Sequence, residues 1–132
     1  MNGPAAPGPV IGIELRSVSR WYGNVVAVND ISFSLGPGVT GLLGPNGAGK
    51  STLLHLMSGF LCPSAGEVEV AGGPAWGRPE RHRVVGFMPE REAVYPFLTG
   101  YEFVRFNARL QGLADVEGAV ARAIEMVGLQ DA

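Results

Sequence analysis

Residues 44–52 read Gly44-Pro45-Asn46-Gly47-Ala48-Gly49-Lys50-Ser51-Thr52. Two glycines five positions apart, followed by lysine and serine, match the pattern of a phosphate-binding loop. Glycines let the backbone bend so that several amide groups point inward at an anion. The helix expected over residues 50–59 would direct the positive end of its dipole at the same place. The pattern predicts a nucleotide triphosphate site; the alternative is a glycine-rich turn that binds no ligand.

Each polar side chain of this segment has its own expected role in binding the nucleotide. Lys50 carries a full charge that can reach the β- and γ-phosphates and stabilise the charge of the transferred group, which makes it the candidate catalytic residue. The Ser51 hydroxyl can ligate Mg²⁺, and Thr52 can donate to the α-phosphate. The expected cofactors are therefore ATP and Mg²⁺. The nucleotide-binding residues predicted in the loop are Gly44, Pro45, Asn46, Gly47, Ala48, Gly49, Lys50, Ser51 and Thr52.

The composition is that of a globular chain, and its single lysine lies in this loop. The chain has 132 residues and a formal net charge of −2, which gives no electrostatic case for nucleic acid. Lys50 is the single lysine beside nine arginines. The lone Cys62 cannot form an internal disulfide and favours a reducing, cytoplasmic setting. No apolar stretch approaches the ~20 residues that span a bilayer, and residues 1–10, rich in Pro, Gly and Ala, are expected to form a flexible tail.

Periodicity outward from the loop predicts an α/β layout with a mixed sheet. Alternation and short apolar runs predict strands over residues 11–20, 25–35, 39–43, 66–71 and 84–88. Helical spacing predicts helices over residues 50–59, 100–110 and 116–127. The first of these should turn Leu53, Leu54, Leu56 and Met57 inward.

Val39 to Thr52 closely resembles the Walker A region of ATP-binding-cassette (ABC) ATPases, and the resemblance extends from about residue 11 to the end of the chain. Trp21-Tyr22-Gly23 is similar to the A-loop of that family, whose aromatic side chain stacks on adenine. The resemblance implies that Tyr22 binds the base. The plainer alternative is a half-buried aromatic at the end of a strand.

Residues 86–92 resemble the family's Q-loop region, with one departure. Glu90 occupies the position of the glutamine that touches Mg²⁺ and the attacking water. A carboxylate can also ligate Mg²⁺, so Glu90 is a second candidate metal ligand. The Pro89-Glu90 pair is similar to cassettes of ABC-2-type exporters. Tyr95 to Thr99 looks like the surface that receives a transmembrane partner, the alternative being an apolar turn that packs against the following helix.

The resemblance implies a P-loop NTPase core with an antiparallel β subdomain and the start of a helical subdomain, incomplete in this chain. It places the tail at residues 1–10, the core at 11–96 with Walker A at 44–51, and the truncated helical part at 97–132. The 132 residues contain no Leu-Ser-Gly-Gly-Gln signature and no Walker B strand. The two histidines, His55 and His82, are expected to be solvated or structural.

The function implied is that of an ATP-binding subunit that powers export by a transmembrane permease. The subunit would pair head-to-tail with a second cassette and lie in the cytoplasm, on the inner face of the membrane. It would be an ATPase if completed, while the 132 residues alone are expected not to hydrolyse ATP. Two alternatives remain open: a non-catalytic nucleotide-binding fragment, and a soluble ABC ATPase outside transport.

Overall fold

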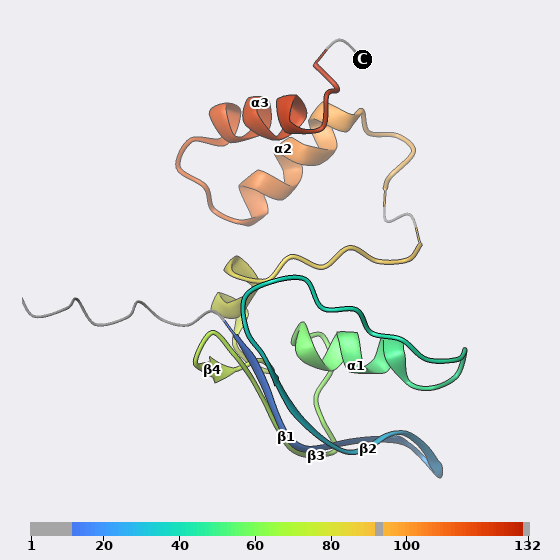
Figure 1. The fold of residues 1–132 in the computed structure, drawn as a ribbon. Helices are drawn as coiled ribbons and strands as arrows, with labels where there is room; N and C mark the ends of the chain where they lie inside the picture. Colours follow the sequence, from blue (N-terminus) through green and yellow to red (C-terminus); the bar gives the residue numbers. More distant parts are fainter. Residues whose placement is uncertain (1–11, 92–93, 131–132) are drawn as a thin grey trace, which may run out of the picture. The chain divides into compact units, whose positions relative to one another are not determined.

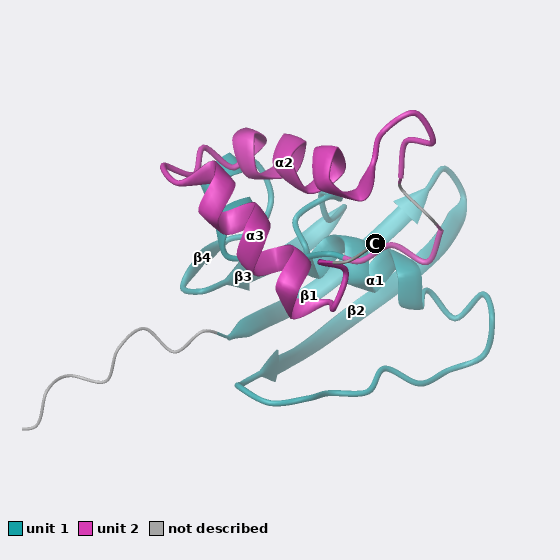
Figure 2. Ribbon diagram, turned by 90° about the horizontal axis from the view of Figure 1, so that it is seen from above, with its two compact units in different colours: residues 1–87 teal, residues 88–132 magenta. Residues whose placement is uncertain are grey.

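The computed structural model describes residues 12–91 and 94–130. The chain forms two compact units, residues up to Phe87 and residues from Met88 onward (Figure 2). The first unit contains the loop at residues 44–49 and the sheet. The second contains a pair of helices, and each unit has its own internal contacts.

The sheet of the first unit is antiparallel throughout its described residues, with the strand order β2-β1-β3-β4. Its strands are β1 (Ile13–Tyr22), β2 (Val25–Leu35), β3 (Ala65–Val70) and β4 (Gly73–Pro74). Gly23 and Asn24 form the turn between β1 and β2, and Gly23 has a positive φ of 58° that a glycine adopts without strain. The predicted strands over residues 25–35 and 66–71 are confirmed in substance, as is the described part of the strand predicted over 11–20. Residue 11 and the tail predicted at residues 1–10 lie outside the described residues.

The β1–β2 pair has three register shifts, and two of them lie beside residues with positive φ angles. Ser17 and Asp30 have positive φ angles, and the register shifts beside them. At these two residues the backbone amide donates to a serine hydroxyl. Ser17 N–H donates to Ser32 Oγ at 2.8 Å, and Asp30 N–H donates to Ser19 Oγ at 2.8 Å. Each bulge adds a residue between inward positions. Simple alternation along β1 does not predict this.

The helix α1 (Lys50–Met57) covers one face of the sheet (Figure 1). Its residues Leu53, Leu56 and Met57 are buried against strand residues, whereas Leu54, predicted to point inward, is 43% exposed. Gly59, with φ 77°, follows the helix where a left-handed residue is expected to end it. The core of the unit consists of Leu15, Val18, Val28, Leu53, Leu56, Met57, Val68, Val70 and Ala75.

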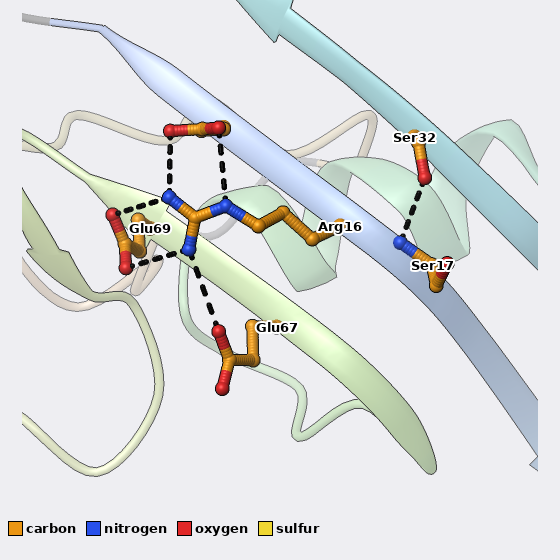
Figure 3. Close-up of polar contacts among 6 residues, drawn as sticks. Arg16, Ser17, Ser32, Glu67 and Glu69 are labelled. Carbon is orange, nitrogen blue, oxygen red and sulfur yellow. Dashed lines mark hydrogen bonds and ion pairs between the residues drawn. The ribbon is translucent and has the colours of Figure 1, made fainter.

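The opposite, solvent-facing side of the sheet carries an ionic cluster around Arg16 (Figure 3). The guanidinium donates to Glu14 at 2.9 Å, to Glu69 at 3.0 Å and to Glu67 at 3.4 Å. Hydrogen bonds to Glu69 and then Glu14 raise the pKa of Arg16 above its ordinary value. Glu67 and Glu69 therefore lie on the solvent-facing side of β3, as their alternation with Val68 and Val70 predicts.

The prediction of a strand is wrong for two segments of the described structure. Residues 39–43 and 84–88 have no strand conformation. Val39 is fully exposed, Leu43 is 94% exposed and Met88 is 93% exposed. A strand persists only when a neighbour accepts its ladder hydrogen bonds, and the described residues supply none to either segment. The sheet is therefore antiparallel here and not mixed.

The second unit is a helical hairpin of α2 (Gly100–Leu110) and α3 (Val116–Met126). Thr99 caps α2 in a reciprocal capping box with Glu102, and Asp115 caps α3 by accepting from Gly118 N–H at 2.9 Å. Glu117 links the helices because it accepts from the Tyr101 hydroxyl and from Arg105 Nε at 2.8 Å. Both predicted helices are confirmed. In the described residues, no helix is long and apolar enough to cross a bilayer.

Candidate functional site: the loop before the first helix

The loop of residues 44–49 leads directly into α1 and is shaped by two glycines. Gly47 and Gly49 have φ angles of 84° and 86°, which L side chains rarely adopt. Ala48 N–H donates to the Pro45 carbonyl at 3.2 Å and closes the turn. The loop is exposed from Gly44 to Ala48, so a ligand can reach its backbone from solvent.

Gly49 fixes the end of the loop against the sheet. A Cβ added to Gly49 would lie 2.2 Å from the carbonyl oxygen of Ala27 and 3.5 Å from Val28 Cγ2. Such a close approach to backbone excludes any side chain. The contact therefore ties the start of α1 to β2.

The first turn of α1 has no side-chain cap. Gly49 is its N-cap and offers no side-chain hydrogen bond, and the turn contains no acidic residue. The helix begins with Leu53 N–H donating to the Gly49 carbonyl at 2.9 Å. The amides at the helix start therefore carry partial positive charge with no capping side chain from Gly49 to satisfy them.

The Lys50 ammonium lies over the loop. Its Nζ donates to the Gly44 carbonyl at 2.5 Å and to the Pro45 carbonyl at 2.8 Å. The side chain thus folds back onto the start of the loop, where two backbone carbonyls accept hydrogen bonds from its charged group. Ser51 is exposed and Thr52 is half-buried at the start of the same helix. The structure brings all of these predicted residues together.

Tyr22 lies at the end of β1, next to the hairpin turn, and is 46% exposed. It pairs with Val25 of β2, the strand whose Ala27 carbonyl faces Gly49. The sheet therefore holds the predicted base-binding side chain on the hairpin that also supports the loop. Arg20, which the sequence did not single out, lies 4.8 Å from the Tyr22 ring centroid, measured from its guanidinium carbon. Its position two residues before Tyr22 on one strand is the signal that could have revealed it.

Glu90 is exposed and belongs to the second unit. Its role as a Mg²⁺ ligand stays a prediction. Among residues 12–91 and 94–130, no group of three or more His, Cys, Asp or Glu side chains could hold a metal ion.

The histidines have structural surroundings. The His55 ring lies 5.2 Å from the Phe87 ring, and the His82 ring stacks on Phe60 at 5.3 Å. Phe60 and Phe87 in turn meet edge to face at 5.4 Å. These four rings connect the end of α1 with the segment that follows β4, which agrees with a structural role for both histidines.

Comparison with known proteins places this loop in a family. The sequence profile described as "ABC transporter" matches residues 28–132. The chain is 35% identical over 123 residues to the Nod factor export ATP-binding protein I of Bradyrhizobium sp. (strain SNU001), covering 91% of the chain and 40% of that protein. It is 33% identical over 123 residues to the spermidine/putrescine import ATP-binding protein PotA of Bacteroides fragilis (strain YCH46), covering 90% of the chain and 26% of that protein.

The fold agrees with a solved structure. The dimeric structure of MJ0796, a bacterial ABC transporter cassette, matches with a TM-score of 0.68 and 24% identity, covering 86% of the chain and 54% of that cassette. The fold is the expected P-loop NTPase core with an antiparallel β subdomain and the start of a helical subdomain. The chain spans less than half the length of the two curated relatives above. It belongs to the ABC transporter family of ATP-binding proteins.

Proposed function

We propose that this chain binds Mg·ATP through residues 44–52, as the ATP-binding subunit of an ABC transporter that powers export through a partner permease. The observation that carries the proposal is the arrangement of Gly49 and Lys50. Gly49 anchors an uncapped helix start against Ala27, and Lys50 extends over the loop. Together they offer amides, a helix dipole and a full positive charge to the same anion.

Each residue has a distinct part in nucleotide binding. The loop amides from Gly44 to Gly49 would surround the phosphates, and Thr52 would donate to the α-phosphate. Lys50 would leave the Gly44 and Pro45 carbonyls and pair with phosphate oxygens, where it stabilises the charge of the transferred group. Tyr22 would stack on the adenine, which its exposed ring can accept.

The residues fit Mg²⁺ in the manner of other phosphate-binding loops. Mg²⁺ keeps several waters and takes substrate phosphates with one or two protein ligands. The exposed Ser51 hydroxyl, one residue after the lysine, supplies one such ligand. Glu90 would supply a carboxylate in place of the family's glutamine. Bound Mg²⁺ would neutralise charge on the phosphates and favour attack by water.

The proposed partners are a transmembrane permease and a second cassette in a head-to-tail dimer, at the cytoplasmic face of the membrane. The names of the relatives support transport: one is an export protein and another an import protein. The solved MJ0796 cassette is dimeric, which supports pairing with a second cassette. The Pro89-Glu90 pair favours export, because it is similar to the pair found in cassettes that serve ABC-2-type exporters.

Hydrolysis is assigned to the completed subunit. The signature sequence and a Walker B strand do not occur in these 132 residues, and the activated-water chemistry of the family depends on them. The chain by itself should therefore bind ATP with no turnover. Sustained ATP hydrolysis by the purified 132 residues would contradict this division of roles.

The direct test is Lys50→Ala in the complete subunit. We expect hydrolysis to fall by about 10²-fold or more, since the variant loses a charge that stabilises the transferred group. Arg83→Gln, which removes a charge from an exposed position in the same unit, is the matched control and should keep the parent rate. Parent-rate hydrolysis by Lys50→Ala would show that the assignment of the loop is wrong.

A further inference from the structure

We propose that Arg20 is a positioning residue for Tyr22: its guanidinium holds one face of the ring, so that the other face receives the purine base of the nucleotide. The inference rests on the proposed function, because it concerns how the same site recognises the base. The carrying observation is the cation–π contact, in which Arg20 Cζ lies 4.8 Å from the Tyr22 ring centroid.

The strand brings the two side chains together. Arg20 and Tyr22 are two residues apart on β1, and side chains at that spacing point to the same face of a strand. The intervening Trp21 points the other way and donates its backbone N–H to Ser64 Oγ at 3.1 Å. Tyr22 therefore has Arg20 as its neighbour along the strand.

Arg20 is itself fixed by the segment that follows α1. Its Nη1 donates to the Cys62 carbonyl at 3.1 Å, and the residue is half-buried. That segment is bound to β1 in turn, since Ser64 N–H donates to the Ser19 carbonyl at 2.8 Å. Arg20 Nε is shielded from solvent and has no hydrogen-bond partner in the part of the chain that the structure describes. The guanidinium is thus held in place by packing against the ring as well as by the Cys62 carbonyl.

The arrangement leaves Tyr22 ready for a base beside the loop. Arg20 occupies one face of the ring, yet Tyr22 remains 46% exposed. Arg20 pairs with Val28 across β1 and β2, and a Cβ added to Gly49 would lie 3.5 Å from Val28 Cγ2. The residues that orient the ring and those that end the phosphate-binding loop therefore contact the same short stretch of β2.

The proposal implies that Arg20 contributes to recognition of the base and not to recognition of the phosphates. Without the guanidinium, the Tyr22 side chain regains rotational freedom, and stacking a base on it must then fix the ring as well. The phosphates would meet the loop amides and Lys50, whereas the hydrogen bond of Arg20 goes to the Cys62 carbonyl. Loss of Arg20 should therefore weaken ATP binding and leave the binding of a ligand without a base unaffected.

The experiment compares two ligands on the 132-residue chain by isothermal titration calorimetry: ATP, and inorganic tripolyphosphate, both with Mg²⁺. In Arg20→Gln we expect ATP affinity to fall about three- to tenfold, with tripolyphosphate affinity unchanged. Arg20→Lys keeps the charge and loses the planar group, so its ATP affinity should be intermediate. Arg83→Gln, a charge-matched change at an exposed position, should alter neither affinity.

A double-variant cycle tests whether Arg20 acts through Tyr22. Adding Arg20→Gln to Tyr22→Ala should cost no further ATP affinity, because there is no ring left to orient. An equal loss for ATP and tripolyphosphate would show a general charge effect and overturn the proposal, as would additive losses in the cycle. If Arg20→Gln does not fold, the ratio of the two affinities in Arg20→Lys decides in the same way. Failure of the unchanged chain to bind ATP would instead contradict the proposed function.

Discussion

The Cα of Gly49 packs so closely on the carbonyl of Ala27 that an added Cβ would lie 2.2 Å from its oxygen. One contact between a loop and a strand thus sets where the first helix starts. Gly49 therefore has two separate reasons to be glycine, its positive φ and the lack of space.

These two reasons can be separated by comparing Gly49→Ala with Gly47→Ala. Both residues have a positive φ near 85°, which costs an alanine about 1–2 kcal/mol. A Cβ on Gly47 has no atom within 4 Å, so only Gly49→Ala should carry a further loss from displacing β2. Urea unfolding measures the difference. Equal free energies of unfolding for the two variants would show that the Ala27 contact has no role.

The Ser51 hydroxyl should make ATP binding depend on Mg²⁺. In Ser51→Ala, the gain in ATP affinity on adding Mg²⁺ should shrink by roughly tenfold, on the scale seen when a metal's supporting ligands are removed. Ser51→Thr keeps the hydroxyl and should retain the gain. Titrations of ATP with and without Mg²⁺ measure both. An undiminished Mg²⁺ effect in Ser51→Ala would remove Ser51 from the metal site.

Glu117 should make the helical hairpin sensitive to acid. The Tyr101 hydroxyl first, and then Arg105, hold the pKa of the Glu117 carboxyl below its ordinary value of 4.5. Because the folded pKa is the lower one, the stabilisation is complete above pH 4.5 and is lost as the pH falls through the folded value. The unfolding temperature of Glu117→Gln should therefore depend less on pH in that window than that of the unchanged chain.

The matched control for that prediction is Glu125→Gln, which removes an exposed carboxylate from the same helix. Thermal unfolding followed by helical circular dichroism across the acid range compares the three proteins. If Glu117→Gln and the unchanged chain lose stability in parallel, the link between Tyr101, Arg105 and Glu117 does not contribute to it.

Arg16 should stabilise the sheet mainly by offsetting the repulsion among three carboxylates. Arg16→Gln leaves Glu14, Glu67 and Glu69 facing one another and is expected to lower the urea midpoint at low ionic strength. The loss should diminish near 1 M salt, because screening shortens the reach of exposed charges to about 3 Å. Arg122→Gln breaks one exposed pair with Asp115 and should have little effect. A salt-independent loss in Arg16→Gln would contradict an electrostatic origin.

The sequence predicts the local features of this fold well. The helices α2 and α3 follow from helical spacing together with caps at Thr99 and Asp115, whose effect depends on near neighbours only. The loop at residues 44–49 is likewise recognisable, because its glycine spacing and the following lysine form a pattern of near neighbours. The roles of its residues in nucleotide binding stay predictions.

The errors arise where structure depends on distant partners. Residues 39–43 are as apolar as a buried strand, but hydrogen-bonded pairing needs a neighbour that periodicity cannot supply. The bulges at Ser17 and Asp30 depend on hydroxyls from paired strands, so the inward positions they create are not visible in either strand alone. The spacing of Arg20 and Tyr22 is visible in the sequence, but the hydrogen bond from Arg20 to the Cys62 carbonyl involves a distant segment and is not.

The exposed run from Val39 to Leu43 has a practical consequence for solubility. Its five residues carry no charge and no proline, and Val39 and Leu43 lie almost entirely in solvent. Short segments of this kind associate with like segments on other molecules when nothing covers them. The 132-residue chain should therefore self-associate as its concentration rises, and a charged substitution such as Leu43→Glu should delay that aggregation without disturbing the sheet.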